Sequence, residues 1–364
     1  MSMHEPLAWV GSPSLGGLRL PSAKLSPSSL YAPRGVWTDG KMLVVADTGN
    51  HRVMIWNELP RYDQAPADIV LGQPDFLSEG PNTNGFEYGM NLPTGVCYED
   101  GRLIVADAWN HRLLVWDKLP DHNCARADHV IGQQDLFSVE VNAGQSCGPT
   151  SLYWPFGIGF VGGRFWITDT GNRRALAFEH LPLHGEKPDL ILGQSDGYQN
   201  EENRGGLTEN SFRWVHAVAG DDDYVFLADA GNHRVLVWPS DVRYDSVPLA
   251  AVGQIDLLSA YEFSLGPQNA KMLRFPYSVT CDKKRLAVAD TANNRILIYD
   301  NYPLECGLPA DSVIGQIDLV SNGENRWQSV THETLCWPYG ICMSGEILAV
   351  ADSGNNRVML WRLS

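Results

Sequence analysis

Basic residues are scarce in this 364-residue sequence, which has 27 Lys and Arg against 43 Asp and Glu and a net charge of -16. A molecule with that charge repels polyphosphates, and no run of Lys or Arg reverses the field locally. Apolar runs long enough to cross a bilayer are also absent, and residues 1–10 lack the basic start and apolar stretch of a secretory signal. We therefore expect a soluble, cytoplasmic protein with no nucleic-acid or membrane partner.

Cysteine is sparse as well. The seven cysteines are scattered and show neither C-x-x-C nor Cys/His zinc spacing, so we expect reduced thiols and predict no metal site. A content of 44% hydrophobic residues excludes a disordered chain, and the 35 glycines are not spaced as in collagen. No fingerprint in the sequence identifies a cofactor.

A long internal repeat is the main positive feature. Segments such as VVADTGNHRVMIW and FLADAGNHRVLVW occur six times, with their aspartates 60 to 62 residues apart. These aspartates are Asp47, Asp107, Asp169, Asp229, Asp290 and Asp352. A Gly-Gln pair and a segment such as Pro-Arg-Gly-Val recur in phase with them. Each unit contains short runs of Val, Ile, Leu and aromatics divided by Gly, Asp and Asn, which predicts four strands.

Six four-stranded units without a helical period predict an all-β, six-bladed β-propeller, and they favour it over a β-solenoid, whose coils are usually shorter. We expect one domain over residues 1–364, and a monomer. The expected blades cover residues 30–75, 90–135, 152–196, 212–256, 273–318, and 335–364 together with 6–12. The last unit lacks a fourth strand of its own, and Gly11 precedes Gly72 by one full period. Residues 6–12 are therefore predicted to complete the last blade and close the ring.

The units resemble NHL repeats, whose D-x-x-N-x-R signature is present at Asp47, Asn50 and Arg52 and in five further copies. The Gly-Gln-x-Asp element is similar to that of a bacterial subgroup of NHL propellers. The resemblance implies the propeller fold more firmly than any activity. Peptide-amidating lyase relatives hold zinc through several histidines, lactonase-like propellers hold calcium near the axis, and RNA-binding NHL propellers have a basic face. The predicted ring offers one histidine and no carboxylate, and the net charge is negative, so none of these three activities is favoured.

Residues that recur in every unit are interpreted as structural. Each Asp is expected to accept hydrogen bonds from backbone N–H groups of the turn that follows it, and the Arg five positions later is expected to pair with that Asp or with a neighbouring blade. The aromatic column that starts at Trp56 is expected to pack blade against blade. His51, His111 and His233 are interpreted as exposed turn residues without a special role.

Function is sought where the six copies differ, on the face that carries the long loops between blades. The residues that begin the inner strands should ring the channel mouth: Arg34, Thr94, Phe156, His216, Tyr277 and Tyr339. Two positions earlier lies a second column: Ala32, Leu92, Trp154, Trp214, Phe275 and Trp337. Trp109 replaces the small residue of the other turns and should lie beside the mouth.

Three functions remain open. The first is a binding module that holds a small molecule, peptide or protein on the loop-rich face. The second is an enzyme of the lyase, hydrolase or cyclase type, with His216, Tyr277 and Tyr339 as catalytic groups. The third is a scaffold whose aromatics only plug the channel. The predicted ligand-binding residues are Arg34, Trp109, Trp154, Phe156, Trp214, Arg274 and Trp337.

Overall fold

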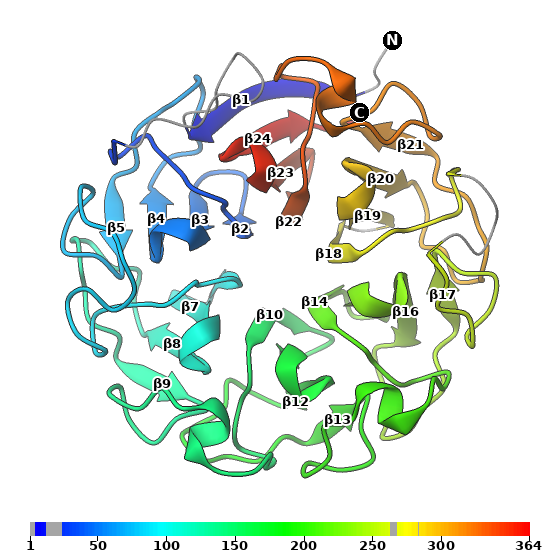
Figure 1. Ribbon diagram of the computed structural model, residues 1–364, viewed down its shortest axis with the longest axis horizontal. Helices are drawn as coiled ribbons and strands as arrows, with labels where there is room; N and C mark the ends of the chain where they lie inside the picture. The colour runs from blue at the N-terminus through cyan, green and yellow to red at the C-terminus, as the bar shows by residue number, and fades with distance from the viewer. Residues whose placement is uncertain (1–3, 12–23, 263–267, 283) are drawn as a thin grey trace.

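The computed structural model describes residues 4–11, 24–262, 268–282 and 284–364, which form six four-stranded antiparallel sheets around an axis (Figure 1). The predicted six-bladed, all-β propeller is confirmed. In each sheet, sequence order runs from the strand at the axis to the strand at the rim, except in the last sheet, which ends with β1 (Glu5–Gly11).

The strands of the first three blades are β2 (Gly35–Thr38), β3 (Leu43–Asp47), β4 (Arg52–Trp56), β5 (Ile69–Leu71), β6 (Val96–Glu99), β7 (Arg102–Asp107), β8 (Arg112–Trp116), β9 (His129–Ile131), β10 (Pro155–Val161), β11 (Arg164–Asp169), β12 (Arg174–Phe178) and β13 (Leu190–Leu192). Those of the last three are β14 (Val215–Gly220), β15 (Tyr224–Asp229), β16 (Arg234–Pro239), β17 (Ala250–Val252), β18 (Pro276–Asp282), β19 (Arg285–Asp290), β20 (Arg295–Tyr299), β21 (Ser312–Ile314), β22 (Pro338–Ser344), β23 (Ile347–Asp352) and β24 (Arg357–Arg362).

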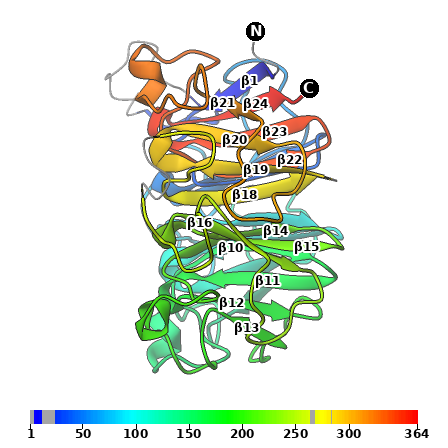
Figure 2. The same ribbon diagram turned by 90° about the vertical axis from the view of Figure 1, so that its right-hand side faces the viewer.

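Short 3-10 helices occupy two kinds of connection. Those between the second and third strands of a blade are η1 (Thr48–Asn50), η2 (Ala108–Asn110), η4 (Thr170–Asn172), η6 (Ala230–Asn232), η7 (Thr291–Asn293) and η9 (Ser353–Asn355). Those in the long connections between blades are η3 (Val141–Gly144), η5 (Glu202–Gly205) and η8 (Glu324–Trp327). Seen edge-on, these turns lie toward one face of the ring (Figure 2). Among the described residues, no helix is long and apolar enough to cross a bilayer.

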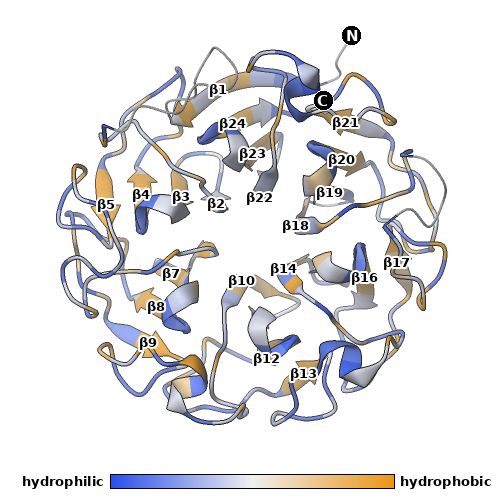
Figure 3. Cartoon of the chain, viewed as in Figure 1, coloured by the Kyte–Doolittle hydropathy of each residue, from blue (hydrophilic) through white to orange (hydrophobic). Residues whose placement is uncertain are grey.

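The hydrophobic core lies between the blades. Each of six clusters of buried apolar side chains combines residues of two neighbouring sheets. Alternation along each strand explains this, since successive side chains point to opposite faces of a sheet and therefore to opposite neighbours. Apolar residues accordingly concentrate in the strands and polar residues in the loops (Figure 3). The aromatic column packs as predicted; Trp116, for example, lies in the cluster between the first two blades.

A buried ion pair occurs once in every blade. Asp47 Oδ2 accepts hydrogen bonds from Arg52 Nε (2.7 Å) and Asn50 Nδ2 (2.8 Å), and both charged side chains are fully buried. Arg52 also donates to the carbonyls of Ser29 (2.9 Å) and Phe76 (2.8 Å), which lie in the connections before and after its own four strands. The structural interpretation of Asp and Arg agrees with these contacts.

One detail of that interpretation was wrong. The second carboxylate oxygen of each Asp binds a backbone N–H located 16 residues earlier, as in Tyr31 N–H to Asp47 Oδ1 (2.6 Å), and not the turn that follows. The same contact recurs for Asp107, Asp169, Asp229, Asp290 and Asp352. The carboxylate therefore fixes the chain just before the innermost strand of its own blade.

The interpretation of the turn histidines as exposed was also wrong. His111 and His233 are 7% and 6% exposed and adopt the left-handed conformation. Their Nδ1 atoms accept the N–H of Trp154 (3.2 Å) and Phe275 (3.1 Å) from the next blade. Asn294 Oδ1 accepts the equivalent N–H of Trp337 (2.9 Å). The residue in this turn thus joins neighbouring blades, which requires a side chain with an acceptor atom two bonds beyond Cβ.

The predicted ring closure is confirmed. Strand β1 pairs antiparallel with β24, from Glu5 opposite Arg362 to Gly11 opposite Arg357, and the two strands lie side by side in the ring (Figure 1). Trp9 is only 4% exposed and belongs to the cluster between the last two blades. Ser12, the last residue of the predicted closing segment, lies outside the described residues.

Deleting residues 1–12 should open the ring. Three buried apolar side chains of β1 and the hydrogen bonds of one strand pair would be lost, and we expect Tm to fall by about 10 °C. Calorimetry of the deletion variant beside Glu5→Gln, which breaks only the exposed pair with Arg362, checks this. A deletion variant that melts like Glu5→Gln would contradict the closure.

The histidine ties predict a pH dependence of stability. Burial lowers the pKa of His111 and His233 from an ordinary 6.5 to about 4. Between these values the unfolded chain binds protons that the folded protein excludes, so the stability contributed by these groups is present above pH 6.5 and is lost as the pH falls toward 4. The double variant His111→Asn/His233→Asn keeps an acceptor and should show a shallower fall of Tm between pH 7 and 4.5. Parallel curves for the two proteins would refute this.

Candidate functional site

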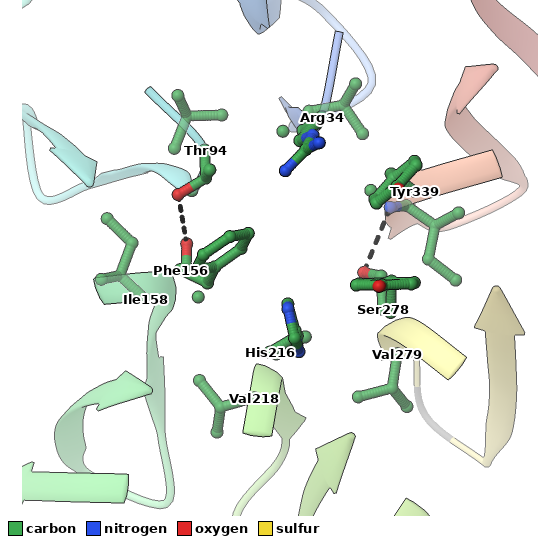
Figure 4. Close-up of a pocket in the computed structure, with 18 residues that line it drawn as sticks. Arg34, Thr94, Phe156, Ile158, His216, Val218, Ser278, Val279 and Tyr339 are labelled. Atoms are coloured by element: carbon green, nitrogen blue, oxygen red, sulfur yellow. Dashed lines mark hydrogen bonds between the residues drawn. The ribbon is translucent and has the colours of Figure 1, made fainter. Parts of the chain in front are cut away.

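The central channel is lined by the residues that begin the inner strands. All six predicted mouth residues, from Arg34 to Tyr339, line one cavity of about 100 Å³. The Arg34 and His216 side chains point into it from opposite sides, whereas Thr94 turns its hydroxyl to the Phe156 carbonyl at 3.1 Å (Figure 4). The prediction that these residues share one channel mouth agrees with this arrangement.

Aromatic rings close much of this mouth. They form one chain of contacts in the order Trp154, Trp109, Phe156, His216, Tyr277 and Tyr339, with successive ring centroids 5.2, 6.1, 4.6, 4.5 and 4.6 Å apart. The Arg34 guanidinium lies 4.8 Å from the Tyr339 ring centre and ends the chain with a cation–π contact. Trp109 therefore stands beside the mouth, as predicted, and acts as a wall between Trp154 and Phe156.

His216 is held in one tautomer. Its Nδ1 lies 2.9 Å from the Trp214 carbonyl oxygen, which can only accept, so Nδ1 carries the proton and Nε2 keeps its lone pair. Burial lowers the pKa of His216 to about 4. Burial, with the neighbouring Tyr339, raises the pKa of Tyr277 to about 12. Both side chains are consequently neutral at pH 7.

A larger pocket lies on the same face, between the fifth and sixth blades. Its volume is about 440 Å³. The lining residues are Arg274, Phe275, Tyr277, Ala292, Asn294, Asn322, Glu324, Trp327 and Trp337. Tyr277 lines both this pocket and the channel, so the two cavities adjoin. Of the predicted ligand-binding residues, Arg274 and Trp337 lie here.

Polar groups in this pocket have defined partners. Trp337 Nε1 donates to Glu324 Oε1 at 3.0 Å, which fixes the carboxylate against the indole. Arg274 forms an ion pair with Glu262. Asn294 Oδ1 accepts the N–H of Trp337, because Asn294 is the turn residue that joins the fifth blade to the sixth.

The remaining predicted residue, Trp214, lies apart from this pocket. Its ring centroid is 6.5 Å from that of Phe275, and Arg213 covers its face. The fourth blade departs from the pattern here for a local reason. The preceding blade carries Arg173 in its turn, which has no acceptor atom, so the Trp214 N–H bonds to Asp229 Oδ1 (3.2 Å) instead.

Glu324 and Trp327 were missed in the sequence. Both residues lie in a long connection between blades, outside the inner strands and the turns in which the departures from symmetry were expected to mark the site. A signal was present there: Asn142, Asn203 and Asn325 align, and the residue two positions later is Gly144, Gly205 and Trp327. Among the described residues, no group of three or more His, Cys, Asp or Glu is placed to hold a metal ion.

Comparison with known proteins adds family relationships to this geometry. The NHL repeat family model matches residues 90–116. NHL repeat-containing protein 2 of Homo sapiens is 28% identical over 95% of this chain, and that of Gallus gallus is 29% identical over 94%. The match covers 48% of each of these two proteins, so the chain spans about half the length of the curated relatives it matches.

A solved structure supports the fold alone. The WD40 beta propeller domain of Doa1 superposes with a TM-score of 0.52, at 10% identity, over 99% of this chain and 97% of that one. At that identity the similarity carries no information on ligands.

The state of His216 can be measured directly. We expect its ring nitrogens, followed by long-range ¹H–¹⁵N correlation, to show the Nδ1–H tautomer without protonation between pH 8 and 5.5, because burial holds its pKa near 4. The imidazole signals that are absent from the spectrum of His216→Gln are assigned to His216. A midpoint near 6.5 would show that the ring is solvated and would contradict the buried, hydrogen-bonded geometry.

Proposed function

We propose that this chain, a six-bladed β-propeller built from NHL repeats, is a binding module whose ligand enters the pocket between the fifth and sixth blades. The observation that carries the proposal is the contrast in size between the two cavities. The pocket holds about 440 Å³ and the channel about 100 Å³. Sites for organic ligands usually hold about 300–1,000 Å³, and of these two adjoining cavities the pocket reaches that range and the channel does not.

The composition of the pocket supports the same role. Phe275, Trp327 and Trp337 provide apolar walls, and Arg274 and Glu324 provide a few polar groups that orient a ligand. The ligand is a small molecule or a side chain of a peptide or protein partner. Trp337, Tyr277 and Arg274 have the binding role; Arg34, Phe156, Trp109 and Trp154 build the adjoining mouth, and Trp214 supports Phe275.

The enzymatic alternative around His216 has less support. A general acid or base works best when its pKa lies near the working pH. His216 and Tyr277, with pKa values of about 4 and about 12, lie far on either side of neutrality. The channel has room for water or a small ion rather than an organic substrate, so proton transfer to a substrate is not favoured there.

A panel of small probes tests the proposal: indole, phenol, benzoate, choline and benzylamine, followed by saturation-transfer NMR. We expect at least one probe to bind, with loss in Trp337→Ala and retention in His216→Gln. The reverse pattern would move the site into the channel and support the enzyme. Absence of binding for every probe would contradict a small-molecule pocket and favour the scaffold interpretation.

A further inference from the structure

The connection that borders this pocket differs from its counterparts in one conspicuous residue. In η3, η5 and η8 an asparagine N–H donates to the carbonyl of Leu152, Phe212 and Leu335, at 3.0, 3.0 and 2.9 Å, so the three loops are structurally equivalent. Two residues later, Gly144 and Gly205 have φ of 75° and 81°. Trp327 occupies the same position with φ of 57°. A bulky L-residue is strained in this left-handed region, whereas glycine is not.

A second substitution in the same loop makes room for the indole. Four residues before the left-handed position, the other two loops have Glu140 and Glu201, but this loop has Gly323. A Cβ at Gly323 would lie 2.6 Å from both Cδ1 and Nε1 of Trp327. A glutamate at position 323, as in the other two loops, would therefore clash with the indole of Trp327. The two departures therefore form a matched pair whose result is a tryptophan held at one wall of the pocket.

Core stability does not explain this arrangement. Trp327 is 79% exposed and Trp337 43% exposed, so both indoles show much of their surface to solvent at the pocket. Strained backbone conformations of this kind persist where the local structure holds them, and they cluster at ligand sites. Trp327 and Trp337 line the same pocket, and the faces of indole rings are electron-rich surfaces that attract cations.

The charges around the pocket select the same class of ligand. The Glu324 carboxylate lies at the Trp337 indole, and in the part of the chain that the structure describes no salt bridge engages it. The positive charge of Arg274 is compensated by Glu262. The net charge of -16 adds a long-range attraction for cations and disfavours anions.

We propose that the pocket binds an organic cation, an alkylammonium group, between Trp327 and Trp337 with Glu324 as the counter-charge. This inference rests on the proposed binding function and specifies its ligand class. The alkylammonium group belongs either to a free small molecule or to a modified lysine side chain of a peptide. Both sources present the same chemistry to the pocket.

Calorimetric titration with choline and with its neutral isostere 3,3-dimethylbutan-1-ol tests the charge requirement. The two probes have nearly the same shape, so a cation–π site should bind choline at least tenfold more tightly. A pentapeptide with a central Nε-trimethyl-lysine separates the two sources. Tighter binding of the peptide than of choline identifies a peptide partner, and equal or weaker binding identifies a free small molecule.

Three variants locate the site. Trp327→Gly restores the residue of the equivalent loops, so we expect an unchanged or higher Tm together with at least a tenfold loss of choline affinity. Glu324→Gln should keep the hydrogen bond from Trp337 and weaken binding several-fold. Glu202→Gln, the matched change in the equivalent loop, should leave choline affinity unchanged.

Two results would overturn the inference. Equal binding of choline and 3,3-dimethylbutan-1-ol would reject a cation site, and so would choline affinity that survives Trp327→Gly. In either case the proposed binding pocket would still be supported if another probe of the earlier panel binds the protein and fails to bind Trp337→Ala. Failure of every probe would reject the pocket and the cation together.

Discussion

The buried pair of aspartate and arginine is the interaction on which each blade depends. Its carboxylate holds the chain before the innermost strand, and its guanidinium reaches the connections on both sides of the blade. Two charges without solvent are costly unless every hydrogen-bonding group has a partner, and removing one partner typically costs about 3–5 kcal/mol. Asn50 and the loop carbonyls provide those partners. A polar clamp at one end of an apolar blade thus fixes where the long connections begin and end, and so where the loop-rich face lies.

A second set of hydrogen bonds joins neighbouring blades. The left-handed turn residue of one blade accepts the N–H of the residue that precedes the next inner strand, which is itself left-handed at Trp154, Phe275 and Trp337. Those residues form the walls beside the channel mouth. The placement of the aromatic surface is therefore set by backbone ties and not by the aromatic side chains themselves. Arg173 has no acceptor atom, and the corresponding residue before the next inner strand, Trp214, is not left-handed and donates its N–H to Asp229 instead.

Much of this fold could be predicted from the sequence, because six copies of one sequence pattern predict six copies of the same four-stranded blade. The period placed Gly11 one unit before Gly72, and this was enough to predict that β1 closes the ring. The partner of the second carboxylate oxygen of Asp47 could not be found, since a bond to a backbone N–H leaves no trace in side-chain chemistry. The buried histidines were mistaken for surface residues because histidine and asparagine both occur commonly in exposed turns.

The candidate site was only partly predictable. Sequence comparison among the six units placed Arg34, His216, Tyr277 and Tyr339 together, as the channel cavity has them. It could not indicate that this cavity is narrow, because channel width depends on how the rings lean against one another. Of the residues that line the wider pocket, the pattern singled out Arg274, Phe275, Tyr277 and Trp337. Its other wall comes from Trp327, whose importance is clear only once its left-handed backbone is known.

Closure by β1 also constrains when the molecule can fold. Pairing of Glu5 with Arg362 joins positions at opposite extremes of the chain, and the apolar cluster that contains Trp9 is incomplete until then. On a ribosome, the early blades can associate as they emerge, but the first strand must wait for the last one. Throughout that interval β1 has no partner strand, and once β24 has formed its outer edge stays open to pairing with another chain until β1 docks. Completion of the ring therefore depends on a single late event, the docking of one seven-residue strand.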